Sequence, residues 1–94
     1  MLEKKWVDDL FDKCLDTWGE EKQLRMVQEE CAELILAVSH YLRNRPDSID
    51  NVKEELADVW LMVSQMIRYY GENEVMEIAA FKSNRTFEKV KRHM

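Results

Sequence analysis

The chain has 94 residues, of which 46% are hydrophobic and 35% are charged, and it contains only two glycines and one proline. This length suits one small domain, and the scarcity of helix breakers predicts an all-α protein in which residues 1–94 form a single helical domain. Fourteen basic and nineteen acidic residues give a net charge of −5, which argues against nucleic-acid binding through a broad basic surface.

Two helices are predicted in the first half of the chain. The first runs from residue 2 to residue 18, where apolar side chains recur every three or four residues. Gly19 is typical of the position just after a helix end. The second runs from residue 20 to residue 44 and ends before Pro46, because proline disfavours the helical conformation in the residue that precedes it.

Two more helices are predicted in the second half. The third begins near Ser48 or Asp50, either of which can cap it, and it stops at Gly71. Asn73 can cap the fourth, which spans residues 74–90. Short connections between long helices predict an antiparallel bundle of about four helices. Because a chain of this length buries only a modest core, we also expect a homo-oligomer.

The cysteines and the apolar runs indicate the compartment. Cys14 and Cys31 form no metal-binding motif, so they are expected to be free thiols in a reducing environment. No apolar run is long enough to span a membrane, and the charged first five residues are not followed by the apolar core of a secretory signal. We therefore expect a cytoplasmic protein.

Two acidic pairs carry the strongest chemical signal. Glu30 and Glu33 lie three residues apart in the second helix, and Glu55 and Asp58 have the same spacing in the third. Residues three apart share one helical face, so each pair directs two carboxylates the same way. None of the four has a Lys or Arg three or four residues away to neutralise it. If the two helices pack antiparallel, the four carboxylates can face one another.

A hard divalent cation is the expected neutraliser. Mg²⁺ prefers six oxygen ligands and completes its shell with water and substrate phosphates, and Mn²⁺ is the expected alternative. A di-iron bundle needs Glu-x-x-His motifs, which the chain lacks, and zinc lacks its usual His and Cys ligands. His40 lies seven residues after Glu33 and is a minor candidate for the same face. A solvated acidic face on both helices is the alternative interpretation.

The strings around these acids resemble the MazG-like all-α nucleoside triphosphate pyrophosphohydrolases. The family motif is E-x-x-E followed, after a variable gap, by E-x-x-D. Here it is embedded in Q-E-E-C-A-E-L at residues 28–34 and K-E-E-L-A-D-V-W at residues 53–60. Trp18, Gly19 and Gln23 are also similar to small members of the family, and the resemblance covers roughly residues 18–88.

The resemblance implies a fold, a reaction and a set of ligands. Family members assemble into dimers or tetramers and hydrolyse a nucleoside triphosphate to the monophosphate and pyrophosphate with Mg²⁺. Because they match the motif, the resemblance implies that the metal ligands are Glu30, Glu33, Glu55 and Asp58. It also implies basic residues on the following helix as phosphate ligands.

Three further roles are expected. The string K-S-N-R makes Lys82, Asn84 and Arg85 the phosphate-binding candidates, and a basic helix end that opposes the helix dipole is the alternative. Glu30 or its neighbour Glu29 is expected to orient or deprotonate the attacking water, and Trp60 is the best candidate for stacking on a base. Two other functions remain open: a non-catalytic helical dimerisation module, and a related pyrophosphohydrolase that acts on a phosphoribosyl compound.

Overall fold

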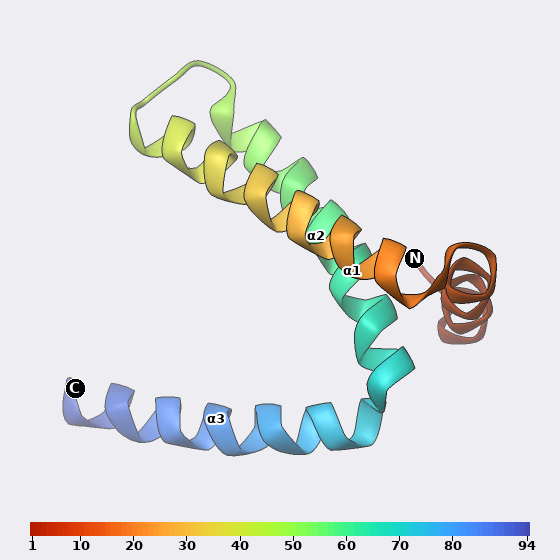
Figure 1. The fold of residues 1–94 in the computed structure, drawn as a ribbon. Coiled ribbons are helices and arrows are strands. Elements are labelled where there is room, and N and C mark those ends of the chain that lie inside the picture. The colour runs from red at the N-terminus through yellow and green to blue at the C-terminus, as the bar shows by residue number, and fades with distance from the viewer.

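The computed structural model describes residues 1–94, all in helices and short connections (Figure 1). Helix α1 spans Lys4–Leu42, α2 spans Ser48–Tyr70 and α3 spans Glu72–Arg92. The all-α prediction is confirmed. The count differs from the predicted four, because the first two predicted helices are joined into one long, kinked helix. No helix combines the length and the apolar character needed to cross a bilayer.

The kink in α1 lies at Gly19. Its φ of 84° and ψ of 166° are not helical, and a positive φ of this size strains any residue that carries a Cβ. Residues 4–18, here called the N-terminal arm, therefore leave the direction of the rest of α1 (Figure 1). Glycine at this position changes the direction of the helix, and the backbone then continues as helix without a connecting loop.

The other helix ends differ from the sequence prediction in detail. α1 stops at Leu42, two residues earlier than expected, and the turn that follows contains Asn44 and Asp47 with φ near 60°. Ser48 donates a hydrogen bond from Oγ to the carbonyl of Arg45 at 2.6 Å. Gly71 has a φ of 124° and is the single residue between α2 and α3. Asn73 therefore lies inside α3 and does not cap it.

The part of α1 after Gly19 pairs with α2 in antiparallel fashion, and most of the tertiary contact lies between these two helices. Inside their interface, Gln23 donates a hydrogen bond from Nε2 to Oε1 of Gln65 at 2.8 Å. Both side chains are buried, with 3% and 5% of their surface exposed. A buried polar pair of this kind costs free energy unless it is matched, so it favours one register of the two helices over the others.

The protomer has a small core. Only five hydrophobic residues are buried, namely Val7, Phe11, Ala37, Met62 and Met66. α3 buries none of its residues, packs only against α2 apart from the ion pair between Glu72 and Lys4, and points away from the other helices (Figure 1). The radius of gyration is 16.1 Å, whereas a compact chain of this length has about 12 Å. A closed four-helix bundle is therefore not formed within one protomer.

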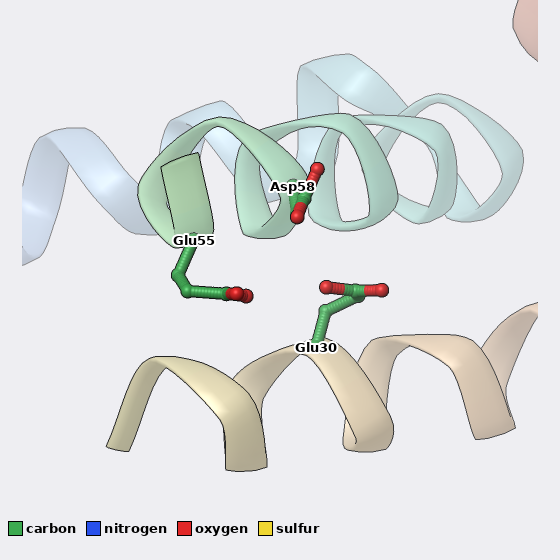
Figure 2. A group of neighbouring side chains, drawn as sticks. All are labelled: Glu30, Glu55 and Asp58. Carbon is green, nitrogen blue, oxygen red and sulfur yellow. The ribbon is translucent and has the colours of Figure 1, made fainter. Parts of the chain in front are cut away.

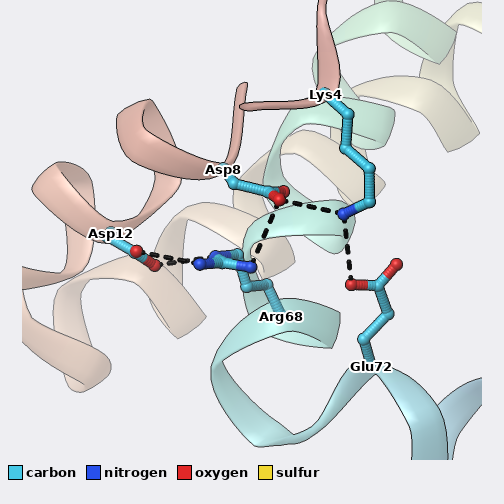
Figure 3. A network of polar contacts seen from close by, with 5 residues as sticks. All are labelled: Lys4, Asp8, Asp12, Arg68 and Glu72. Atoms are coloured by element: carbon cyan, nitrogen blue, oxygen red, sulfur yellow. Dashed lines mark hydrogen bonds and ion pairs between the residues drawn. The ribbon is translucent and has the colours of Figure 1, made fainter. Parts of the chain in front are cut away.

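Ion pairs hold the N-terminal arm and the start of α3 against the end of α2 (Figure 3). Arg68 donates two hydrogen bonds to the carboxylate of Asp12, at 2.8 and 3.0 Å, and approaches Asp8 at 3.4 Å. Lys4 contacts Asp8 at 2.9 Å and Glu72 at 3.7 Å. Pairs this exposed contribute little stability each, but together they link three segments at one point.

Candidate metal centre

Three carboxylates converge between α1 and α2. Glu30 projects from α1, and Glu55 and Asp58 project toward it from α2 (Figure 2). One oxygen from each of the three lies within 4.8 Å of the others. This arrangement places both predicted acidic pairs at one site, and we call Glu30, Glu33, Glu55 and Asp58 together the acidic cluster.

The register of the helix pair explains the convergence. Two turns along each helix from the hydrogen bond between Gln23 and Gln65 lie Glu30 on α1 and Asp58 on α2, because seven residues make about two turns. The next turn of each helix brings Glu33 opposite Glu55. Glu33 is outside the tightest group of three oxygens, yet its charge acts on both Glu30 and Glu55.

The acidic cluster raises the pKa of two of its members. Partial burial is the main cause for Glu30, followed by the negative charges of Glu33, Asp58 and Glu55. Burial is also the main cause of the raised pKa of Glu55, followed by the charges of Glu33 and Asp58. The charges that act on these two groups are all acidic. A site with this field attracts a proton or a cation.

The cluster also contains unsatisfied oxygen atoms. Oε2 of Glu30 and Oε2 of Glu55 are shielded from solvent and accept no hydrogen bond. Withdrawing an ionised carboxylate oxygen from water without a donor is costly. Hard oxygen ligands without nitrogen or sulfur are the donor set of Mg²⁺ and Mn²⁺. The residues present therefore fit a divalent cation of this kind.

Two predicted site residues lie beside the cluster. Glu29 is exposed, and its charge makes a small contribution to the raised pKa of Glu30. Trp60 lies one turn or less from Asp58 along α2, but its ring is 6.2 Å from that of Phe11 in the N-terminal arm, and 47% of its surface is exposed. Trp60 thus lines the groove between α2 and the arm, while Glu55 and Asp58 point toward α1.

The predicted phosphate ligands are on a separate element. Lys82, Asn84 and Arg85 are exposed on α3. Neither basic residue forms an ion pair within the protomer; the basic partners in such pairs are Lys4, Arg25, Arg68 and Lys91. α3 does not pack against the part of α1 that carries Glu30 and Glu33, and its contact with α1 is the ion pair between Glu72 and Lys4 in the N-terminal arm. The structure of one protomer therefore does not bring these residues together with the acidic cluster.

Two features of the site surroundings were not anticipated. The pair Gln23 and Gln65 fixes the register beneath the cluster, and Arg68 ties the N-terminal arm to α2. Each glutamine lies seven residues from a cluster acid, on the same helical face. This spacing in the sequence could have indicated that the two glutamines meet. Arg68 and Asp12 are 56 residues apart, and nothing in their local sequence indicates that they meet.

These features define the class: an all-α protein in which two antiparallel helices present a carboxylate cluster suited to a divalent cation. A model of the MazG nucleotide pyrophosphohydrolase domain matches residues 19–93. The chain therefore belongs to the MazG nucleotide pyrophosphohydrolase family. The match begins at the kink and includes the paired helices and all of α3. Searches of curated proteins and of solved structures found no match.

Proposed function

We propose that the protein is a Mg²⁺-dependent nucleoside triphosphate pyrophosphohydrolase, which converts a (d)NTP and water to the (d)NMP and pyrophosphate. The observation that carries this proposal is the acidic cluster, with two shielded oxygens that lack any partner, in a chain of this family. An acidic cleft repels a triphosphate by itself, so the cation is needed to join the two. Removal of damaged or surplus nucleotides is the corresponding role.

The cluster residues take the roles that their positions allow. Glu30, Glu33, Glu55 and Asp58 would hold Mg²⁺, or Mn²⁺ in its place. The cation, when bound, would offset the negative charge of the phosphate oxygens and would make the attacking water more acidic. Glu30, or the exposed Glu29 beside it, accepts the proton of the attacking water. The water oxygen forms a bond to the α-phosphorus, and the bond to the bridging oxygen breaks to release pyrophosphate.

Residues outside the cluster would hold the rest of the substrate. Lys82, Asn84 and Arg85 bind the β- and γ-phosphates and offset the charge of the leaving pyrophosphate, with Arg85 able to bind two oxygens at once. Trp60 offers a partly exposed aromatic face for the base. The phosphate assignments are supported by residue type and by their place on α3, the helix that follows the E-x-x-D pair, and the assignment of Trp60 by its exposed ring.

A homo-oligomer is part of this proposal. The protomer exposes 7717 Å², whereas a compact monomer of 11.3 kDa exposes about 5,700 Å². The excess, about 2,000 Å², exceeds the roughly 800 Å² that each partner buries in a standard interface and falls in the range of obligate dimers. Large exposed apolar residues on α1, α2 and α3 supply the surface.

The direct test is the identity of the phosphate product. With Mg²⁺ and a panel of nucleoside triphosphates, the protein should release pyrophosphate and no orthophosphate. Asp58→Asn and Glu55→Gln should lower the rate by more than the roughly 10–100-fold that loss of an outer-shell partner of a metal ligand costs, because each removes a proposed ligand itself. Glu54→Gln is the matched control, since Glu54 is an exposed neighbour of Glu55, and it should keep most of the activity.

The same assay separates the two alternative functions. A non-catalytic dimerisation module would show no hydrolysis, and its melting temperature would not respond to millimolar Mg²⁺. A pyrophosphohydrolase for phosphoribosyl compounds would be stabilised by Mg²⁺ but would not hydrolyse nucleoside triphosphates. It would instead cleave a phosphoribosyl pyrophosphate. Full activity of a folded Asp58→Asn variant would contradict the assignment of the cluster.

A further inference from the structure

Two glycines form neighbouring hinges at one end of the helix pair. Gly19 bends α1 with a φ of 84° and a ψ of 166°, and Gly71 joins α2 to α3 with a φ of 124°. Glycine adopts such conformations readily because it has no Cβ, and it leaves the backbone freer to rotate than other residues do. The residues beside the hinges are tied together, since the hydroxyl of Tyr70 donates a hydrogen bond to Oε2 of Glu20 at 2.6 Å. The N-terminal arm and α3 therefore leave the helix pair from neighbouring points.

One ion pair joins the arm to α3 beyond these hinges. Lys4, the first residue of α1, contacts Glu72 in the first turn of α3 at 3.7 Å (Figure 3). Apart from this pair, α3 packs only against α2 and buries none of its residues. Few contacts therefore oppose a change in its direction. The ion pair lies close to Gly71, and a small shift there is amplified along a helix about 30 Å long, because each of its 21 residues rises about 1.5 Å.

The arm, by contrast, is held firmly on α2. Phe11 is 4% exposed, and Arg68 donates two hydrogen bonds to Asp12. Within the arm, Lys4 donates a hydrogen bond to Asp8 at 2.9 Å, and Asp8 in turn lies 3.4 Å from Arg68. The position of the Lys4 amine is thus set by the docked arm. The ion pair with α3 therefore transmits the position of the arm to α3.

The arm and α3 also line one apolar groove. It has a volume of about 690 Å³, runs along α2, and is lined by Leu2, Val7 and Phe11 from the N-terminal segment and by Met76 from α3. A displaced arm would leave one side of this groove open to water. Because exposed apolar surface is unfavourable, the direction of α3 that exposes the least of it would then change. Ionic and apolar contacts thus couple the same two segments.

We propose that the N-terminal arm sets the direction of α3. While the arm is docked, the pair between Lys4 and Glu72 holds α3 at the observed angle, and when the pair is broken α3 turns about Gly71. The family match begins at Gly19, so the arm lies outside the matched domain and acts on a helix within it. Salt screens exposed charges, and all of these ion pairs are exposed, so ionic strength is one signal to which the arm responds.

The consequence for the reaction rests on the proposed function. α3 carries Lys82 and Arg85, the proposed phosphate ligands, and a change in its direction would move both away from the phosphates. Breaking the pair between Lys4 and Glu72 would then raise the KM for the nucleotide more than it lowers kcat, because substrate binding and not the acidic cluster is disturbed.

A distance within one chain tests the coupling without any reference to activity. Both native cysteines are replaced by serine, and spin labels are attached to Lys53→Cys on α2 and Lys89→Cys on α3, two exposed positions. Refolding with an excess of unlabelled chains restricts dipolar EPR to distances within one chain. Glu72→Gln should shift or broaden the distance distribution. Glu74→Gln is the matched control and should leave it unchanged, since Glu74 is an exposed acid in the same first turn that forms no ion pair.

Three further measurements identify the cause of the shift. Lys4→Gln together with Glu72→Gln should shift the distribution no further than either change alone, because both remove the same contact. About 1 M salt should move the wild type toward the Glu72→Gln distribution. Phe11→Ala, which releases the arm, should do the same.

The proposal has two refuting outcomes. Equal distributions for Glu72→Gln and Glu74→Gln would show that the ion pair does not hold α3. An unchanged distance in Phe11→Ala, when the fluorescence of Trp60 shows that the arm has left, would show that α3 is independent of the arm. If the wild type releases no pyrophosphate, the proposed function fails, while the distances still decide whether the arm directs α3.

Discussion

The buried hydrogen bond between Gln23 and Gln65 offers a sharp test of how the site is positioned. Gln65→Leu removes the acceptor and leaves the amide of Gln23, which is 3% exposed, without a partner. An unsatisfied buried amide costs about 1–3 kcal/mol. For a domain of about 100 residues this corresponds to a fall in melting temperature of roughly 5–20 °C. Gln28→Leu, on the exposed side of α1, should change the melting temperature by little.

The double variant Gln23→Leu, Gln65→Leu separates stability from register. Replacing both partners by apolar groups of similar size is nearly neutral, so its melting temperature should recover toward that of the wild type at equal protein concentration. Two apolar faces no longer select one register, however, so stabilisation by Mg²⁺ should be weaker than in the wild type. Thermal melts with and without Mg²⁺ measure both effects. A single variant as stable as the wild type, or a double variant that binds Mg²⁺ fully, would refute this reasoning.

Three further outcomes are expected. Because the pKa values of Glu30 and Glu55 are raised in the folded protein, the metal-free fold should lose stability as the pH rises above 4.5, the pKa of these groups in the unfolded chain. Mg²⁺ should therefore raise the melting temperature more at about pH 7.5 than at about pH 5. An equal effect of Mg²⁺ at both pH values would contradict the assignment of the cluster. Gly19→Ala should cost about 1–3 kcal/mol by urea unfolding, because φ of 84° with ψ of 166° is a conformation that essentially only glycine adopts, and the added Cβ would meet no atom within 4 Å that could offset the strain. Phe11→Ala, at a site that is 4% exposed, should cost about 3–5 kcal/mol and release the N-terminal arm, which tryptophan fluorescence of Trp60 would report.

The sequence was sufficient for the parts of the fold that depend on local spacing. Helical periodicity placed each acidic pair on one face, and the missing basic neighbours argued against a solvated surface role for these acids. The pairing of α1 with α2 then followed from their short connection. The family assignment rested on the residues that flank Glu30 and Asp58, and the match over residues 19–93 confirms it.

The arrangement of segments that are far apart in the sequence could not be predicted from local spacing. A glycine after an apolar stripe predicts an interruption, but whether Gly19 ends a helix or bends it depends on what the N-terminal arm packs against. The direction of α3 is likewise set where α2 ends, by Gly71 and by the ion pair between Lys4 and Glu72. Periodicity says which face of α3 is apolar, and it does not say whether that face meets its own chain or another.

The acidic cluster and the position of α3, which lies at an angle to α2 and away from the cluster, are physically related. Four carboxylates in the centre of a helix pair repel one another, and the pKa values of Glu30 and Glu55 are raised first by partial burial and then by that repulsion. A compact protomer with α3 folded onto this pair would satisfy the charges with its own lysine and arginine, and it would leave the substrate no room. Under the proposed function, the position of α3 away from the helix pair would keep the cluster free for a cation and would leave Lys82 and Arg85 available for the phosphates.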